Sequence, residues 1–192
     1  MIVTYTENSF PRNYIPTVLD SYWCEQQFGD TAVSLSLWDT AGQEGYSRIR
    51  TLSYPCTDVF LVCFSVVNLA SFENVRANWV PEIKHHVPDA AIILVGTKVD
   101  LRDDAKTLQD LRQEGMKPIT AAQGRDMANA VGAYTYVENS ALTQKGLRET
   151  FETALRTVIA HTKAQKKQKV KRQKREKALP QPPVMPPAGK AP

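Results

Sequence analysis

The sequence has few cysteines and no long apolar run. The first argues against a disulfide framework or a cysteine metal site, and the second against a membrane span. Its three cysteines, Cys24, Cys56 and Cys63, form neither an even disulfide set nor a metal-ligand spacing. Cys63 lies inside an apolar run, where we expect a small core residue. That run, VFLVCF at residues 59–64, is far shorter than the ~20 residues of a membrane span. The N-terminal residues lack the basic and apolar regions of a signal peptide, so we expect a reducing, cytoplasmic environment.

Charge is distributed unevenly along the chain. The 192 residues have a formal net charge of +4, but residues 163–192 contain ten Lys or Arg and one acidic residue, Glu176. Residues 1–162 contain fourteen basic and nineteen acidic residues, a net charge of −5. We therefore expect one folded domain over residues 1–162 and a disordered tail over residues 163–192, first basic and then proline-rich.

Strand-like and helix-like patterns alternate and predict an α/β domain. Residues 31–39 alternate between apolar and polar, as in a half-buried strand. Residues 58–65 and 91–96 are continuously apolar, which is typical of parallel strands buried on both faces. Three further segments are predicted to be helical. Apolar residues recur at helical spacing at Phe72, Val75, Trp79 and Ile83, and again at Leu147, Phe151, Leu155 and Ile159. Thr120 and Gln123 form a capping box, which marks the start of the other helix. This order favours a mainly parallel sheet with helices on both faces.

The segment WDTAGQE, residues 38–44, contains side chains suited to phosphate and magnesium chemistry. Asp39 follows a strand and enters a turn, and a carboxylate there can bind a magnesium ion beside a phosphate. Gly42 leaves its backbone N–H open to an anion, and the amide of Gln43 can orient an attacking water. The alternative interpretation is that Asp-Thr-Ala-Gly only forms a tight turn.

Two later segments are suited to recognising a guanine base. In TKVD, residues 97–100, the carboxylate of Asp100 can accept two N–H bonds that guanine offers and adenine does not. The stem of Lys98 can cover one face of the base, although Lys-x-Asp is also common on ordinary surfaces. In SAL, residues 140–142, backbone N–H groups can meet the guanine carbonyl oxygen. Each segment is weak evidence alone, but the three in this order are specific.

Together these segments resemble the Ras superfamily of small GTPases, and more closely the Rac-like branch of the Rho family. The closer resemblance rests on YIPTV, WDTAGQE, TLSYPCTDVFLVCFS, SFENVR, WVPEI, ILVGTKVDLRDD and NSALTQKGL, and covers roughly residues 1–160. The charged segment 101–117, where we expect a short surface helix ending near Gly115, lies where Rho proteins carry an extra helix. The resemblance implies a small-GTPase fold and a signalling switch that binds and hydrolyses GTP and regulates the actin cytoskeleton.

The resemblance also implies roles for individual residues. It implies that Thr17 and Asp39 bind Mg²⁺ and that Gln43 is the catalytic residue, positioning water as in the general scheme of phosphoryl transfer. The residues implied to bind GTP or GDP are Phe10, Tyr14, Thr17, Asp39, Ala41, Gly42, Thr97, Lys98, Asp100, Leu101, Ser140, Ala141 and Leu142. Effector proteins, exchange factors and GTPase-activating proteins would contact two switch segments. Switch I begins at Tyr14 and ends at Tyr22, and switch II begins at Gly42 and ends at Arg50.

The sequence lacks the phosphate-binding loop of such proteins. No G-x-x-x-x-G-K-[ST] occurs in it, and Met1 falls where relatives are already within the first helix. That loop makes several charge-assisted hydrogen bonds, each worth roughly 1.5–3 kcal/mol, so we expect nucleotide binding to be weakened more than about a thousandfold. The first strand, which in the family lies between the strands expected at 31–39 and 58–65, is also missing. We expect either a new pairing of these two strands or a marginally stable domain.

The tail has no prenylation motif, because the chain ends in GKAP and has no cysteine after Cys63. Nine Lys or Arg within residues 163–177 can attract the anionic inner face of the plasma membrane. The alternatives are a solvated tail, a nuclear-import signal or nucleic-acid binding. Nucleic-acid binding is the least favoured, because no aromatic residues are interleaved to stack on bases. Lys177, Pro180 and Pro183 have the spacing of a basic residue before PxxP, a ligand motif of SH3 domains.

Two hypotheses for the function follow. The first is a Rho/Rac-type GTPase whose activity is impaired in this chain because the phosphate loop is absent. The second is a nucleotide-free pseudo-GTPase that acts as an interaction protein.

Overall fold

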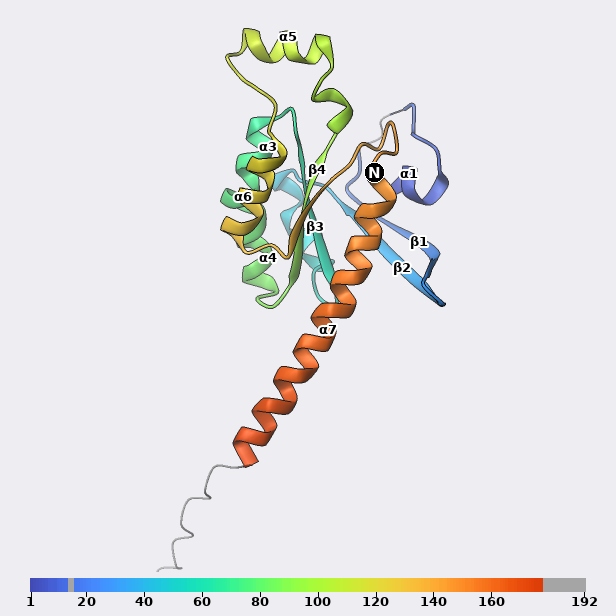
Figure 1. Ribbon diagram of the computed structural model, residues 1–192, viewed down its shortest axis with the longest axis vertical. Coiled ribbons are helices and arrows are strands. Elements are labelled where there is room, and N and C mark those ends of the chain that lie inside the picture. Colours follow the sequence, from blue (N-terminus) through green and yellow to red (C-terminus); the bar gives the residue numbers. More distant parts are fainter. Residues whose placement is uncertain (14–15, 178–192) are drawn as a thin grey trace, which may run out of the picture. The chain divides into compact units, whose positions relative to one another are not determined.

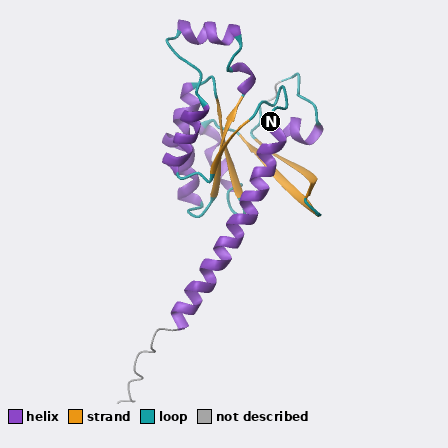
Figure 2. Ribbon diagram, in the orientation of Figure 1, coloured by secondary structure: helices purple, strands orange, loops and turns teal. Residues whose placement is uncertain are grey.

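The structure is a computed structural model that describes residues 1–13 and 16–177 (Figure 1). The chain divides into two units, Met1–Val158 and Ile159–Pro192, and each is described by itself. The first unit contains two separate sheets, and most of its helices lie around the three-stranded one (Figure 2). In chain order the elements are α1 (Ile2–Glu7), β1 (Leu19–Phe28), β2 (Thr31–Thr40), the 3₁₀ turn η1 (Glu44–Tyr46), α2 (Ser47–Leu52), β3 (Val59–Ser65), α3 (Leu69–Asn74), the π-helical turn η2 (Val75–Trp79), α4 (Val80–His86), β4 (Ala91–Thr97), the 3₁₀ turn η3 (Val99–Leu101), α5 (Ala105–Gln113), α6 (Ala121–Val131), β5 (Thr135–Glu138) and α7 (Leu147–Lys177).

The larger sheet is parallel, in the order β3-β4-β5, with β4 at its centre. Successive side chains of a strand point to opposite faces, and β4 buries both. Ile92 and Leu94 belong to the cluster formed with α4 and α6, whereas Ile93 and Val95 pack with Ala154 of α7. In Figure 1, α3, α4 and α6 accordingly lie on one side of this sheet and the first turns of α7 on the other. The predicted α/β class, with a parallel sheet and helices on both faces, is confirmed.

The smaller sheet is an antiparallel hairpin of β1 and β2. The two strands pair from Leu19 opposite Thr40 to Phe28 opposite Thr31. Gly29, at the turn, has φ of +59°, a left-handed conformation that favours glycine in a tight hairpin. The sequence pattern predicted β2 but not β1, because the polar residues of β1 hide the alternation between its half-buried and exposed positions.

The hairpin and the parallel sheet remain separate. Among residues 1–13 and 16–177, no backbone hydrogen bond joins β2 to β3. Of the two expected alternatives, the new pairing of these strands therefore does not form, and the marginally stable domain stays a prediction. Cys63 on β3 is exposed rather than in the core, since its strand borders the gap between the sheets. The prediction for Cys63 was therefore wrong, because an apolar neighbourhood in the sequence does not reveal that one strand edge is uncovered.

Local capping signals in the sequence were reliable. The capping box of Thr120 and Gln123 begins α6, as predicted. The short surface helix expected within residues 101–117 is α5, and Gly115 follows its last turn with φ of +69°. The Met116 N–H donates to the Leu111 carbonyl at 2.8 Å, which completes a Schellman end to that helix.

The backbone of the basic run is helical, where we expected disorder from residue 163. Helix α7 continues to Lys177, and its basic part consists mainly of Lys, Arg, Gln and Ala, which have high helix propensity. The prediction considered the charge of this run and neglected its propensity. The proline-rich segment, with Pro180 and Pro183, lies outside the described residues, and the domain boundary at residue 162 stays a prediction. In the described part of the chain, no helix combines the length and apolarity needed to span a bilayer.

Candidate functional site

The end of β2 and the segment before β1 bring the two predicted magnesium ligands together. Thr17 donates from Oγ1 to Oδ2 of Asp39 at 3.2 Å. Nearby, the Ala41 N–H donates to the carbonyl of Val18, the residue after Thr17, at 3.0 Å. These two bonds fix the end of β2 against the start of β1. Of the other predicted residues in this region, Phe10 is 46% exposed and Tyr14 lies outside the described residues.

The donor set at this point suits magnesium. Thr17 and Asp39 offer oxygen atoms, the ligands that Mg²⁺ prefers, and Mg²⁺ commonly uses one or two protein oxygens together with water and phosphate. Over residues 1–13 and 16–177, no cluster of three or more His, Cys, Asp or Glu side chains forms a closed metal site. The pair therefore fits an ion held jointly with a phosphate, and not an ion enclosed by protein ligands.

Arg50 binds the backbone of the loop that follows Asp39. The Arg50 Nη1 donates to the Ala41 carbonyl at 2.8 Å and to the Gln43 carbonyl at 3.4 Å. Gly42, between them, is exposed and approaches Trp79, which would lie 3.5 Å from a Cβ at that position. Gln43, which caps the start of the turn η1, is also exposed. The loop thus presents Gly42 and Gln43 outward while its carbonyls are bound inward.

Arg50 is itself fixed by a carboxylate on α4. Its Nε and Nη2 donate to the two oxygens of Glu82 at 2.9 and 2.8 Å, and Tyr54 donates to the same carboxylate at 2.5 Å. The hydrogen bonds from Arg50 hold the pKa of Glu82 below its ordinary value, and burial with the Glu82 contact raises the pKa of Tyr54. The Arg50 guanidinium also lies 5.0 Å from the centre of the Trp79 ring. None of these residues was predicted to serve the site, because no local motif signals a contact that spans 32 positions.

The two predicted guanine-recognition segments lie at adjacent strand ends. Gly96 of β4 is in register with Glu138 of β5, so the segments that follow both strands emerge together. The Val99 N–H donates to the Asn139 carbonyl at 3.3 Å and ties the two segments directly. In the first of them, Lys98 is exposed with φ of +60°, and residues 100 and 101 are half-buried.

In the second segment, the backbone N–H of Ser140 is already hydrogen-bonded within the protein. The N–H of Ser140 donates to the Lys145 carbonyl at 2.9 Å, and its Oγ accepts the Thr143 N–H at 3.1 Å. Ser140 is fully buried, and its two hydrogen bonds shape the turn. Its contact with a base stays a prediction. The backbone of Ala141, which is half-buried, and of Leu142, which is 58% exposed, remains for that contact.

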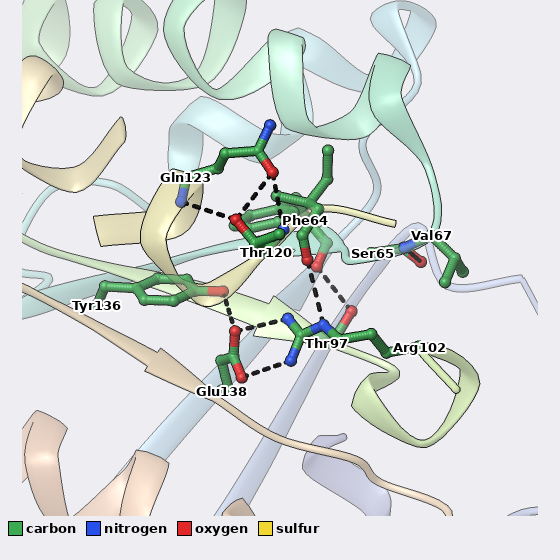
Figure 3. A network of polar contacts seen from close by, with 10 residues as sticks. Phe64, Ser65, Val67, Thr97, Arg102, Thr120, Gln123, Tyr136 and Glu138 are labelled. Atoms are coloured by element: carbon green, nitrogen blue, oxygen red, sulfur yellow. Dashed lines mark hydrogen bonds and ion pairs between the residues drawn. The ribbon is translucent and has the colours of Figure 1, made fainter. Parts of the chain in front are cut away.

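A polar network that includes Arg102 and Glu138 braces both segments (Figure 3). Arg102 donates from Nη1 and Nη2 to the two oxygens of Glu138 at 2.9 and 2.6 Å. Tyr136 donates to Glu138 at 2.7 Å, and Thr97 donates to the Phe64 carbonyl of β3 at 2.9 Å. The hydrogen bonds from Arg102 hold the pKa of Glu138 below its ordinary value. No sequence motif pointed to Arg102 or Glu138; the only available signal was a carboxylate at the last position of β5.

Glycine is required where Tyr136 crosses the sheet. A Cβ on Gly96 or on Gly124 of α6 would collide with the Tyr136 ring or its hydroxyl. The two glycines therefore let the ring lie close to β4, and its hydroxyl reaches Glu138 from that position. In this way the packing of α6 on the sheet also helps to position Glu138, beside the two predicted guanine-recognition segments.

Three of the predicted site residues border one open space. A cavity of about 950 Å³ lies between β2 and β3, and Asp39, Gly42 and Thr97 are among the residues that line it. Asp39 and Thr97, at the end of β4, therefore face a common opening.

A sequence model of the Ras family matches residues 1–160. The chain belongs to the Ras family, whose members are generally small GTP hydrolases that use GTP or GDP with Mg²⁺. Such proteins generally bind effectors, exchange factors and GTPase-activating proteins. The matched region contains every residue predicted for the site.

Proposed function

We propose that this chain is a Rho/Rac-type guanine-nucleotide switch, whose affinity for GTP and GDP is weakened because its sequence has no phosphate-loop motif. The observation that carries the proposal is the bond between Val99 and Asn139, which joins the two base-recognition segments at 3.3 Å. Membership in the Ras family supports the switch function. The helix α5, within the charged segment that Rho proteins add, supports the Rho/Rac assignment.

Each part of the site has a distinct role in this proposal. Asp100 accepts two N–H bonds from guanine, and the stem of Lys98 covers the base. Thr17 and Asp39 hold Mg²⁺, which neutralises charge on the phosphates when it is bound. Gln43 orients the attacking water, and the Arg50 contacts keep the loop of Gln43 in place.

The partner surfaces follow from exposure and charge. Switch II presents Tyr46 and Ile49, which are 37% and 39% exposed, and these suit effectors, exchange factors and activating proteins. The helical basic run, residues 163–177, suits an anionic membrane surface, which would place a cytoplasmic protein at the inner face of the plasma membrane. The motif from Lys177 to Pro183 suits an SH3 domain, although all of it after Lys177 lies outside the described residues.

A nucleotide-free interaction protein is the second candidate function. It is favoured by the absence of a phosphate-loop motif in the sequence and by the open cavity beside Asp39. In this case the switch surfaces and the basic run would act without a nucleotide.

Equilibrium binding of GDP and ADP to the purified chain, with Mg²⁺ present, separates the two functions. We expect negligible nucleotide to survive purification, and weak binding at high concentration that prefers GDP over ADP. Asp100→Asn should abolish that preference, since an amide cannot accept both N–H bonds, whereas Asp103→Asn at an exposed neighbouring position should retain it. Equal binding of GDP and ADP by the parent chain would support the nucleotide-free function instead.

Hydrolysis tests the role of Gln43. With GTP in excess, Gln43→Leu should bind GTP as the parent chain does and release phosphate more slowly, because leucine cannot orient water. Gln27→Leu, on the hairpin, is the matched control. Equal rates for the parent chain and Gln43→Leu would refute the assigned role.

A further inference from the structure

One ion pair connects the two predicted base-recognition segments through the residues that flank them. Arg102 directly follows the turn η3, which contains Asp100. Glu138 ends β5, directly before Asn139. The Arg102 and Glu138 side chains, 36 positions apart in the sequence, meet through two hydrogen bonds of 2.9 and 2.6 Å. A bidentate pair of this kind fixes the relative orientation of its two partners as well as their distance.

The position of Asp100 depends on contacts made at both ends of its turn. η3 is a single 3₁₀ turn, Val99–Leu101, and such turns are short and have poorer hydrogen-bond geometry than an α-helix. On the side of β4, the Thr97 hydroxyl donates to a carbonyl of β3 at 2.9 Å. On the other side, the Arg102 Nε donates to the Ile119 carbonyl at 3.2 Å, while the rest of the guanidinium binds Glu138. Arg102 therefore anchors one end of the turn that presents Asp100.

The carboxylate of Glu138 is itself held in a fixed place on the sheet (Figure 3). Tyr136 donates to it at 2.7 Å, and the Tyr136 ring occupies the space left by the missing side chains of Gly96 and Gly124. The Asn139 N–H donates to the Gly96 carbonyl at 2.8 Å, which ties the start of the second segment to β4. Arg102 is thus bound to a rigid part of the domain.

The chemistry of guanine explains why the separation of the two segments matters. The base carries a carbonyl oxygen beside its N–H donors, whereas adenine carries an amino group in place of that oxygen and has no ring N–H there. The Asp100 carboxylate is predicted to accept from the N–H donors, and the backbone of Ala141 is predicted to donate to the oxygen. Both groups read one edge of one base, so their separation has to match it to within about 0.5 Å.

We propose that Arg102 and Glu138 are positioning residues that determine guanine specificity by fixing the separation between Asp100 and Ala141. Neither residue touches the nucleotide in this proposal, which rests on the guanine-nucleotide function proposed above. The predicted magnesium ligands, Thr17 and Asp39, belong to other elements of the fold. The pair should therefore affect the preference between bases and leave untouched the affinity that all nucleoside diphosphates share.

The test is the ratio of the GDP and ADP affinities of the full chain, measured with Mg²⁺ by protein NMR titration, which resolves weak binding. Arg102→Gln should lower the affinity for GDP and leave that for ADP unchanged, so the ratio falls about fivefold, the lower end of typical coupling between sites. Glu138→Gln should have the same effect. The double variant should lose no more than either single variant, because both changes remove the same contact.

Two further variants separate positioning from general stability. Tyr136→Phe keeps the ring against Gly96 and removes only the hydroxyl that donates to Glu138, so the ratio should fall in the same direction but by less. It also keeps the test decisive if Arg102→Gln does not fold. Arg148→Gln is the matched control, because Arg148 makes a 3.0 Å ion pair on α7, is 78% exposed and lies outside both segments. That control should retain the ratio of the parent chain.

Each contrary result has a distinct meaning. If the parent chain prefers GDP and the variants at Arg102, Glu138 and Tyr136 keep its full preference, the positioning role is overturned and the proposed function stands. If folded variants lose GDP and ADP affinity equally, the pair only supports the fold, and the positioning role is again overturned. Equal binding of GDP and ADP by the parent chain would overturn the proposed function and this inference together.

Discussion

Replacing Arg50 by methionine should destabilise the domain by about 3 kcal/mol. The Arg50 side chain is 6% exposed, and its loss leaves the Glu82 carboxylate with Tyr54 as a donor and removes the donor to the Ala41 carbonyl. Breaking a buried ion pair typically costs 3–5 kcal/mol. We expect about 3 kcal/mol, the lower end of that range, because Glu82 is 24% exposed and water can solvate part of its charge.

Urea denaturation of the parent chain and of Arg50→Met, with unchanged m-values, measures this free energy of unfolding. Arg156→Met is the matched control, because Arg156 pairs with Glu152 on the helix surface at 64% and 34% exposure. That control should lose at most about 0.5 kcal/mol. The double replacement Arg50→Met with Glu82→Leu should recover part of the loss, since no unpaired charge remains.

Hydrogen exchange provides a second readout of the same change. In Arg50→Met, the amides of residues 41–43 should exchange faster, because the carbonyls of that loop lose their bonds to the guanidinium. If Arg50→Met and Arg156→Met lost equal stability and the loop exchanged as before, the argument for Arg50 as the anchor of the loop would fail.

Three further predictions concern pH, capping and the tail. Because Arg102 depresses the pKa of Glu138, their pair stabilises the fold above the ordinary Glu pKa of about 4.3 and loses this contribution as the pH falls below it. Urea midpoints at neutral and acid pH should therefore differ less for Glu138→Gln than for the parent chain, and an identical difference would contradict the depressed pKa. Thr120→Ala should lower the free energy of unfolding by about 1 kcal/mol, because it removes the oxygen that caps α6, and a loss near zero would count against that cap. The basic run, residues 163–177, should bind anionic but not neutral vesicles in co-sedimentation, and deletion of residues 163–192 should abolish this; binding that survives about 0.5 M salt would show another anchor.

The sequence determined the parts of the fold that depend on short-range patterns. Continuous apolar runs marked β3 and β4, helical spacing marked the segments around Val75 and Phe151, and the Thr120 capping box marked the start of α6. The segments proposed to bind the nucleotide were also inferred from the sequence, from side chains at fixed spacing, and their role stays a prediction. The basic run, by contrast, was predicted to be disordered from its charge, although its residues have high helix propensity and the helix continues to Lys177.

Only the tertiary structure decided which distant groups meet. Arg50 and Glu82 are 32 positions apart, and Arg102 and Glu138 are 36 apart, so no local motif connects them. The N–H of Ser140 looked free in the sequence, but the turn directs it to the Lys145 carbonyl.

The unpaired edge of β3 in the described part of the chain belongs to the same class of property. An apolar run specifies that a strand should be buried, but the pairing of its edges depends on which other strands lie beside it. The sequence of β3 therefore predicted a core strand, whereas among residues 1–13 and 16–177 one of its edges pairs with no other strand. Hydrophobic pattern is a property of a segment, whereas hydrogen-bond partners are a property of the whole chain.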